Sequence, residues 1–461
     1  MNLGETARAI FISALAECDI ENAFRRKSEV DRGTASYRFT LQGGLDEPAV
    51  SVDLGAFDRI LVIAVGKASG TMLRGLLSTL PIPPQARLDG VLISPDADEE
   101  IPYTFQHFAG GHPEPNEASF AGARTVIEML REAARRKEVE RTFCFFLVSG
   151  GASTMMEMPL DSRVALPDMV HFHQTLVHCG APISEINCVR KHISAVKGGR
   201  LGEIVAHIPN LTILVSDVPL SQYDALGSGP TIPDSTTVEQ CLSIVERYNL
   251  IERFTAPVRA IFVPTQLRET PKPGAYRAAV STLLAAEDLA EAARRAAESC
   301  GFDTHVDLTC DDWDYRLAAD YLLEKFRTLR KSGTPVCLIS VGEISVSISS
   351  DDGRKMCGVG GRNQHFVLYV ATQVRREDHS IAILSAASDG IDGNSPFAGA
   401  VVDDVTLELL RSGEGPEGVT MSLAVAALDG FDASTVLRRL NATIETGPTG
   451  NNLRDLRILL G

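Results

Sequence analysis

Polar and charged side chains follow short apolar segments of the sequence, each time next to glycine. Lys67 stands two residues after Arg59–Val65 in VGKASG, the SGGAS loop (149–153) ends the apolar run Thr142–Val148, and Asp217 follows LTILV. In open α/β sheets, ligands bind beyond the carboxyl ends of strands, where glycine lets backbone N–H groups approach an anion. The SGGAS candidates are Ser149, Gly150, Gly151 and Ser153.

Lys67 and Asp217 are the candidates for direct chemistry in these loops. A lysine at this place reaches a phosphate or carboxylate as a point charge. An aspartate at a strand end holds Mg²⁺ through water or accepts a proton from a substrate. The residues alone leave the alternatives open, which are a solvated surface lysine and an aspartate that caps a turn.

The densest positive cluster is VRKHISAVKGGR, residues 189–200. We predict one helix over Glu185–His207, on which Arg190 and Lys197 share a face. The cluster then predicts an anion-binding surface, and its alternative is a solvated basic helix face. Its cationic members are Arg190, Lys191, Lys197 and Arg200.

A second group of candidates lies in the last third of the sequence. Arg362 opens a predicted helix in GVGGRNQH, and an arginine there stabilises charge on a transferring phosphoryl group. Asp389 and Asp392 follow the run IAIL, where they bind a divalent cation or shape an Asx-turn.

Several familiar sites are disfavoured by spacing. The sequence has no G-x-x-x-x-G-K-[ST] phosphate loop, and VGKASG lacks the middle glycine of a dinucleotide-binding G-x-G-x-x-G. His171 and His173 would point about 200° apart on a helix, which disfavours a zinc site with His178 and Cys179.

Charge and composition exclude other classes of function. The 461 residues include 44 Lys plus Arg and 60 Asp plus Glu, a net charge of −16. Such acidity argues against binding nucleic acid or an anionic membrane surface, so any positive site must be local. No apolar run approaches the roughly 20 residues of a membrane span. An amphipathic N-terminal helix and nine scattered cysteines favour a cytoplasmic protein with reduced thiols.

Short apolar runs alternate with helical patterns, which predicts an α/β fold with parallel strands covered on both faces. We place a linker at Pro264–Tyr276, between domains 1–265 and 266–461, and a hairpin tip at Asp351–Gly353. The predicted strands are Arg59–Val65, Gly90–Ile93, Thr142–Val148, Leu211–Val215, Thr304–Leu308, Pro335–Ile339 and Ile381–Leu384. The predicted helices are Glu117–Lys137, Leu166–Cys179, Glu185–His207, Val238–Tyr248, Ala286–Cys300, Asp314–Lys331 and Asn363–Arg376.

The loops carry a series of motifs in a known order. They are GGHPEPNEAS (110–119), SGGAS (149–153), KHISAVKGGRL (191–201), SDVPLSQYDALGSGPTIPDSTT (216–237), GGRNQ (360–364), SDGIDG (388–393) and TGPTGNNLRDL (446–456). From about Arg59 to Leu456 the sequence resembles the type-2 glycerate kinases, whose C-terminal part is called the MOFRL domain.

The resemblance implies a Rossmann-like N-terminal domain with a parallel sheet, a smaller α/β MOFRL domain and an active site in the cleft between them. It implies transfer of the γ-phosphoryl group of ATP to D-glycerate with Mg²⁺, giving 2-phosphoglycerate, and catalytic roles for Lys67, Asp217 and Arg362. The expected binding partners are small molecules, D-glycerate and ATP. We expect no binding to nucleic acid or to a membrane, and the sequence leaves open whether the protein forms a homodimer. Four departures from the family pattern leave the acceptor range open: Ala152 in SGGAS, VGEI at 341–344, His365 after GGRNQ and NSPF at 394–397.

We expect the SGGAS loop, with Lys191, Lys197 or Arg200, to hold the substrate carboxylate or the phosphates of ATP. Further binding candidates are Glu343, Asn363 and Asp389, and the expected Mg²⁺ ligands are Asp217 and Asp389. The alternatives are an NAD(P)-dependent hydroxypyruvate reductase, a kinase for a related small hydroxy acid, and a sensor that binds without turnover.

Overall fold

The computed structural model describes residues 2–31, 37–44, 47–96, 101–137, 140–262, 267–347 and 358–461. The chain forms two compact units. We call Ile20–Ala285 the N-terminal unit, and residues 1–19 together with Ala286–Gly461 the C-terminal unit. No helix in the described part of the chain is both long and apolar enough to cross a membrane.

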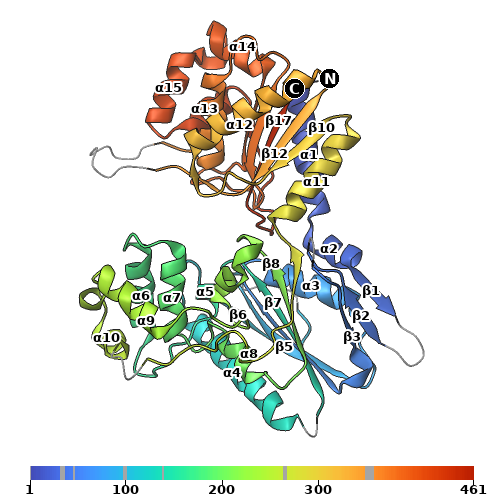
Figure 1. The fold of residues 1–461 in the computed structure, drawn as a ribbon, viewed down its shortest axis with the longest axis vertical. Coiled ribbons are helices and arrows are strands. Elements are labelled where there is room, and N and C mark those ends of the chain that lie inside the picture. Colours follow the sequence, from blue (N-terminus) through green and yellow to red (C-terminus); the bar gives the residue numbers. More distant parts are fainter. Residues whose placement is uncertain are drawn as a thin grey trace. The chain divides into compact units, whose positions relative to one another are not determined.

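The N-terminal unit is built on a six-stranded parallel sheet (Figure 1). Its strands are β4 (Arg59–Val65), β5 (Arg87–Ser94), β6 (Phe105–Ala109), β7 (Thr142–Ser149), β8 (Asn210–Val215) and β9 (Val280–Leu284). Every residue of β4 and β7 is buried, as expected of central parallel strands covered on both faces. The spatial order β6-β5-β4-β7-β8-β9 is the Rossmann order, which reverses between β4 and β7. The predicted Rossmann-like parallel sheet is confirmed.

Helices pack on both faces of this sheet, and a further helical group has its own core. α2 (Ile20–Lys27) and α3 (Ser69–Thr79) pack together, as do α4 (Glu117–Arg136) and α8 (Arg200–Ile204). The further group buries Phe172, Val189 and Cys241, among others. It consists of α6 (Leu166–Val177), α7 (Ile183–Ile193), α9 (Val238–Arg247) and α10 (Ala256–Ile261).

The smaller elements of the N-terminal unit include a three-stranded antiparallel sheet of β1 (Ser28–Asp31), β2 (Arg38–Leu41) and β3 (Val50–Asp53). They also include α5 (Ala152–Met155) and the 3₁₀ segments η1 (Leu54–Ala56), η2 (Leu220–Ser228) and η3 (Ile251–Arg253).

The C-terminal unit has a mixed sheet in the order β10-β12-β17-β14-β15-β16. These strands are β10 (Asp303–Asp307), β12 (Val336–Val341), β17 (Asp455–Leu460), β14 (Ala382–Ala387), β15 (Gly399–Asp403) and β16 (Thr443–Ile444). α1 (Leu3–Glu17) packs with α11 (Ala286–Ser299), and α12 (Tyr315–Leu329) packs with α13 (Arg362–Gln373). The remaining elements are β11 (Trp313–Asp314), β13 (Ile344–Ser345), η4 (Arg330–Ser332), α14 (Asp404–Ser412), η6 (Pro416–Gly418), α15 (Met421–Asp429) and α16 (Ala433–Arg439).

All seven predicted strands are confirmed as strands, but the expected parallel direction is wrong for most of the second sheet. Only β10 and β12 pair in parallel there, and the other pairs are antiparallel. Strands β12 and β14 are fully buried. A strand covered on both faces is apolar along its whole length whatever its direction, so the apolar runs do not reveal the pairing.

The helix predicted over Glu185–His207 is also wrong. α7 ends at Ile193, where Ser194 takes an extended backbone conformation. Gly198 and Gly199 follow with φ angles of 58° and 81°, and α8 begins only at Arg200. Backbone of this kind favours glycine and breaks a helix. Arg190 and Lys197 therefore do not share a helix face.

The two units divide elsewhere than at the predicted boundary of 265 and 266. β9 pairs with β8, so the chain stays in the N-terminal unit until Ala285. Thr270 also donates to Asp234 over 2.9 Å within that unit. The first 19 residues belong to the C-terminal unit because α1 packs on α11. Residues 263–266 and the predicted hairpin tip Asp351–Gly353 lie outside the described residues.

Candidate functional site

The loops after β4, β7 and β8 meet at the point where the strand order reverses. The N–H of Lys67 donates to the carbonyl of Gly150 over 2.8 Å. The hydroxyl of Ser149 accepts from the N–H of Ala68 over 3.0 Å. These two bonds join the first loop to the second, at the place where open α/β sheets bind ligands.

Asp217 reaches the same place from β8. A Cβ at Gly150 would lie 2.1 Å from Asp217 Oδ2, and a Cβ at Gly151 would lie 3.1 Å from Lys67 Cγ. Only glycine therefore fits at Gly150 without moving the carboxylate. The structure brings together Lys67, the SGGAS backbone and Asp217, each of which the sequence places after a predicted strand. We call these residues the switch-point site.

The switch-point site combines opposite charges with close access to the backbone. Lys67 is exposed and Asp217 is half-buried. A lysine, glycine backbone and a carboxylate are the groups that bind a phosphate chain and activate a hydroxyl. The carboxylate also suits Mg²⁺, which one or two carboxylates hold together with phosphate oxygens.

His112 is a member of this site that sequence reasoning missed. Its Nδ1 lies 3.2 Å from the hydroxyl of Thr154, and a Cβ at Gly151 would lie 3.4 Å from the same nitrogen. Burial, together with the positive charge of Lys67, lowers the pKa of His112. The imidazole is therefore neutral at physiological pH. His112 belongs to the motif GGHPEPNEAS, which marks the segment in the sequence but does not reveal what the imidazole ring contacts.

Ser153 links the site to α7 through two hydroxyls. The Ser153 and Ser228 hydroxyls lie 2.8 Å apart, and Ser228 donates to Asn187 Oδ1 over 3.2 Å. Ser228 and Asn187 are buried. This chain of hydrogen bonds fixes α7 against the end of η2 and the start of α5.

Lys191 does not project a free charge toward this site. Its ammonium is buried and lies 2.7 Å from Asp224 and 3.2 Å from Asp234. Asp234 also accepts from Thr236 and Thr270. Two carboxylates thus neutralise this lysine, and its contacts are those of a residue that stabilises the fold.

Lys197 is likewise paired inside the protein. It donates to Glu157, and both side chains are 1% exposed. His173 Nε2 lies 3.0 Å from the same carboxylate, and Ser194 donates to it over 2.7 Å. Burial alone would raise the pKa of Glu157, but Lys197 and His173 more than offset this and lower it to about 2.

Arg200, His171 and His178 each have a backbone carbonyl as partner. Arg200 Nη2 donates to the carbonyl of Arg268 over 3.2 Å. His171 Nε2 lies 2.7 Å from the carbonyl of Arg253, and His178 Nδ1 lies 2.8 Å from that of Gln174. Within the described ranges, no cluster of three or more His, Cys, Asp or Glu side chains has the arrangement of a metal site.

A second charged cluster lies in the C-terminal unit around Arg362, the first residue of α13. Its Nε donates to Asp455 over 2.6 Å, and its Nη2 donates to Glu343 over 2.8 Å. Burial works against the charge of Arg362, but Asp455 and Glu343 more than offset it, so the pKa of Arg362 is raised. Asp455 is a second residue that sequence reasoning missed, although it belongs to the motif TGPTGNNLRDL.

Asn363 and Asp392 form the buried base of this cluster. Asp392 accepts from the backbone N–H groups of Asn363 and Gln364, at 3.0 and 2.8 Å, and so caps α13. Asn363 accepts from Ser385. Asp389 accepts from the N–H of Ile391 over 3.0 Å, which is the hydrogen bond of an Asx-turn.

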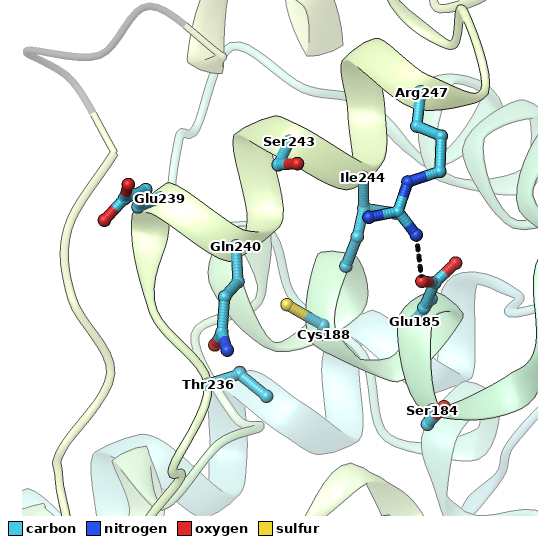
Figure 2. Close-up of a pocket in the computed structure, with 9 residues that line it drawn as sticks. All are labelled: Ser184, Glu185, Cys188, Thr236, Glu239, Gln240, Ser243, Ile244 and Arg247. Carbon is cyan, nitrogen blue, oxygen red and sulfur yellow. Dashed lines mark hydrogen bonds and ion pairs between the residues drawn. The ribbon is translucent and has the colours of Figure 1, made fainter.

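A cavity of about 440 Å³ lies between α7 and α9 (Figure 2), and none of the predicted site residues lines it. Arg247 donates to Glu185 over 2.5 Å at its edge. It is lined by Ser184, Glu185, Cys188, Thr236, Glu239, Gln240, Ser243, Ile244 and Arg247. None of these residues follows a strand of the sheet, so the candidate site stays at the switch point.

Comparison with known proteins agrees with the motifs. Residues 6–263 match the model described as a domain of unknown function, DUF4147, and residues 336–455 match the MOFRL family model. A D-glycerate 2-kinase from Thermotoga maritima is 32% identical over 410 residues, which cover 87% of this chain and 90% of that protein. The chain belongs to the type-2 glycerate kinase family.

This type-2 glycerate kinase family member is also similar to solved structures over its whole length. A crystal structure of a glycerate kinase from Thermotoga maritima matches with a TM-score of 0.79 and 27% identity over 99% of both chains. One family relative, from Agrobacterium vitis, bears a provisional hydroxypyruvate reductase name and is 29% identical over 407 residues, 87% of both proteins.

We expect Glu157→Gln to destabilise the protein near neutral pH and to reduce its sensitivity to acid. The pKa of Glu157 is about 2 in the folded protein and ordinarily 4.5. The ionised carboxylate therefore stabilises the fold fully above pH 4.5, and this contribution is lost as the pH falls toward 2. The shift corresponds to about 3 kcal/mol.

Urea unfolding at pH 6, 4 and 3 measures this free energy. The control is Glu128→Gln, which removes an exposed carboxylate of α4. Equal acid sensitivity of Glu157→Gln and the wild type would contradict the role assigned to this ion pair.

Proposed function

We propose that this protein is an ATP-dependent glycerate 2-kinase, which transfers the γ-phosphoryl group of ATP to the 2-hydroxyl of D-glycerate. The observation that carries the proposal is the switch-point site, where Lys67 and Asp217 flank the backbone of Gly150. The names of the relatives supply the kind of reaction, a kinase, and the acceptor, D-glycerate.

We assign each residue of the switch-point site a step in the transfer. Asp217 accepts the proton of the 2-hydroxyl as its oxygen bonds to the γ-phosphorus, and the bond to the ADP oxygen breaks. Lys67 neutralises the phosphoryl oxygens as a point charge. The glycine backbone allows the phosphates close approach. We assign the neutral imidazole of His112 a hydrogen bond to the same phosphate groups.

Arg362 is the third catalytic residue that we propose. Its guanidinium is fixed by Asp455 and Glu343, so it contributes charge with little loss of side-chain freedom. We assign it the stabilisation of charge on the transferred phosphoryl group. Glu343 and Asn363 then orient Arg362 and its helix instead of contacting substrate.

Mg²⁺, when bound, neutralises phosphate charge, and Asp217 is the carboxylate that would hold it in the N-terminal unit. Asp389 stays a predicted ligand, with one carboxylate oxygen engaged in its Asx-turn. We omit Lys191 and Lys197 from substrate binding because their side chains are 3% and 1% exposed and already pair with carboxylates, whereas the paired Arg362 side chain keeps 33% exposure.

We place the reaction in the cytoplasm, which supplies ATP and keeps thiols reduced. Cys18, Cys144, Cys188 and Cys241 are among the cysteines that are free thiols in the structure. A homodimer stays a prediction.

We expect Lys67→Ala and Arg362→Ala each to lower kcat/KM for ATP-dependent phosphorylation of D-glycerate by roughly 10²- to 10³-fold, because each removes charge that stabilises the transition state. A coupled ADP-release assay measures the rate. Lys137→Ala, which removes an exposed lysine at the end of α4, is the matched control. Near-wild-type kcat in both variants would overturn these assignments.

We expect Gly150→Ala to reduce the same rate at least about 10²-fold, because the added Cβ displaces the Asp217 carboxylate from its place against the backbone. Gly180→Ala is the control, since a Cβ there meets nothing within 4 Å and adds only the strain of a φ of 81°. Comparable activity of the two variants would show that the close approach at Gly150 is not needed.

The product distinguishes the proposal from its main alternative. With ATP and D-glycerate we expect ³¹P NMR to show a phosphomonoester on the 2-oxygen and ADP. With NADH and hydroxypyruvate we expect no loss of absorbance at 340 nm, since the sequence lacks G-x-G-x-x-G. NADH oxidation without phosphoryl transfer would favour the reductase instead.

A further inference from the structure

Arg190, on the last turns of α7, is a buried cation whose Nε has no hydrogen-bond partner among the described residues. Its side chain belongs to a residue that is 9% exposed. A guanidinium has five N–H donors, and leaving such groups unpaired inside a protein is costly.

The side of α7 that carries Asn187 and Arg190 packs against η2, which in turn packs on α5 just after the glycine loop. Asn187, Arg190 and Ser194 follow one another at spacings of three and four residues, which places them on one side of the helix. Asn187 accepts from Ser228, whose hydroxyl contacts Ser153.

Ser194, at the other end of this face, donates to Glu157 over 2.7 Å. Asn187 reaches Ser153 through Ser228, whereas Ser194 contacts Glu157 directly, so this side of α7 lies along the segment from Ser153 to Glu157 that leaves the glycine loop. Arg190 lies between them on the helix and therefore faces this segment.

The charges around Arg190 do not balance. Glu157 is close enough to oppose the lowering of the Arg190 pKa that burial causes, but the same carboxylate already receives the ammonium of Lys197. Burial lowers the pKa of His173, so its imidazole is neutral at pH 7. Burial lowers the pKa of Lys197 as well, and Glu157 opposes this lowering for both Lys197 and Arg190. One carboxylate therefore serves two basic groups, and the guanidinium of Arg190, which stays protonated in proteins, lacks a full counter-charge.

A buried charge without a full counter-charge calls for an anion. Leaving a buried charge without its partner destabilises a protein strongly, because the charge has lost its water and gains no counter-charge. A ligand that brings a single negative charge to Arg190 relieves this cost. A single guanidinium suits a carboxylate, whereas ATP carries several negative charges and is already served by Lys67 and the glycine backbone.

We propose that Arg190 binds the carboxylate of the acceptor substrate and so selects small 2-hydroxy acids over uncharged alcohols. This inference rests on the proposed kinase function. The planar guanidinium matches a carboxylate through two parallel N–H···O bonds, which a lysine cannot form. The acceptor is then held by its acid group at Arg190, with its hydroxyl free to meet Asp217.

The test compares Arg190→Met and Arg190→Lys with wild type, using D-glycerate and its uncharged methyl ester as acceptors. We expect the KM for D-glycerate to rise about 10- to 100-fold in both variants, the KM for ATP to stay unchanged, and the preference for the acid over the ester to disappear in Arg190→Met. Arg124→Met, at an exposed position on α4, is the control.

Binding of D-glycerate without ATP, measured by calorimetry, separates this inference from the kinase proposal. If wild type transfers no phosphate but binds D-glycerate and Arg190→Met does not, the kinase proposal fails and the role of Arg190 stands.

Unchanged binding and KM for D-glycerate in the Arg190 variants overturns the inference, and so does a rise confined to the KM for ATP. Arg190→Lys keeps the positive charge but removes the two parallel N–H donors of the guanidinium. Its KM for D-glycerate therefore tests the role of Arg190 if Arg190→Met does not fold.

Discussion

Neutralisation of one buried carboxylate organises much of the N-terminal unit. Glu157 receives hydrogen bonds or ion-pair contacts from His173 of α6, from Ser194 just after α7 and from Lys197 ahead of α8. These groups come from separate stretches of the chain, and none can be withdrawn without leaving polar atoms unpaired in the interior. Because Glu157 closely follows α5, the same contacts hold the exit of the glycine loop. The binding residues of the site therefore depend on a carboxylate that itself faces no solvent.

The main elements of the candidate site could be predicted from sequence because their positions follow from the sheet. The apolar runs before Lys67, Ser149 and Asp217 have the length and composition of buried strands, and parallel strands end at a common edge. Which loops become neighbours could not be predicted, since the pairing of β4 with β7 joins segments far apart in the sequence. His112 and Asp455 lie within quoted motifs, but their contacts arise only from the tertiary fold.

The basic segment 189–200 shows the opposite case. Its lysines suggest a binding surface because their partners, Glu157, Asp224 and Asp234, are distant in sequence. The break between α7 and α8 had a local signal, since the paired glycines 198 and 199 interrupt the helical pattern. The antiparallel pairing of β17 between β12 and β14 had none, because a fully buried strand looks the same in either direction.

The place of α1 links the order of synthesis to the order of folding. α1 packs on α11 and contacts β14 and β17, so its partners are made long after it. Residues 20–285 contain every strand of the parallel sheet, and that unit can fold while translation continues. α1 instead keeps its apolar side exposed until β17 has emerged from the ribosome. A polypeptide fused in front of α1 would for that reason disturb the folding of the C-terminal unit, most of which is translated last.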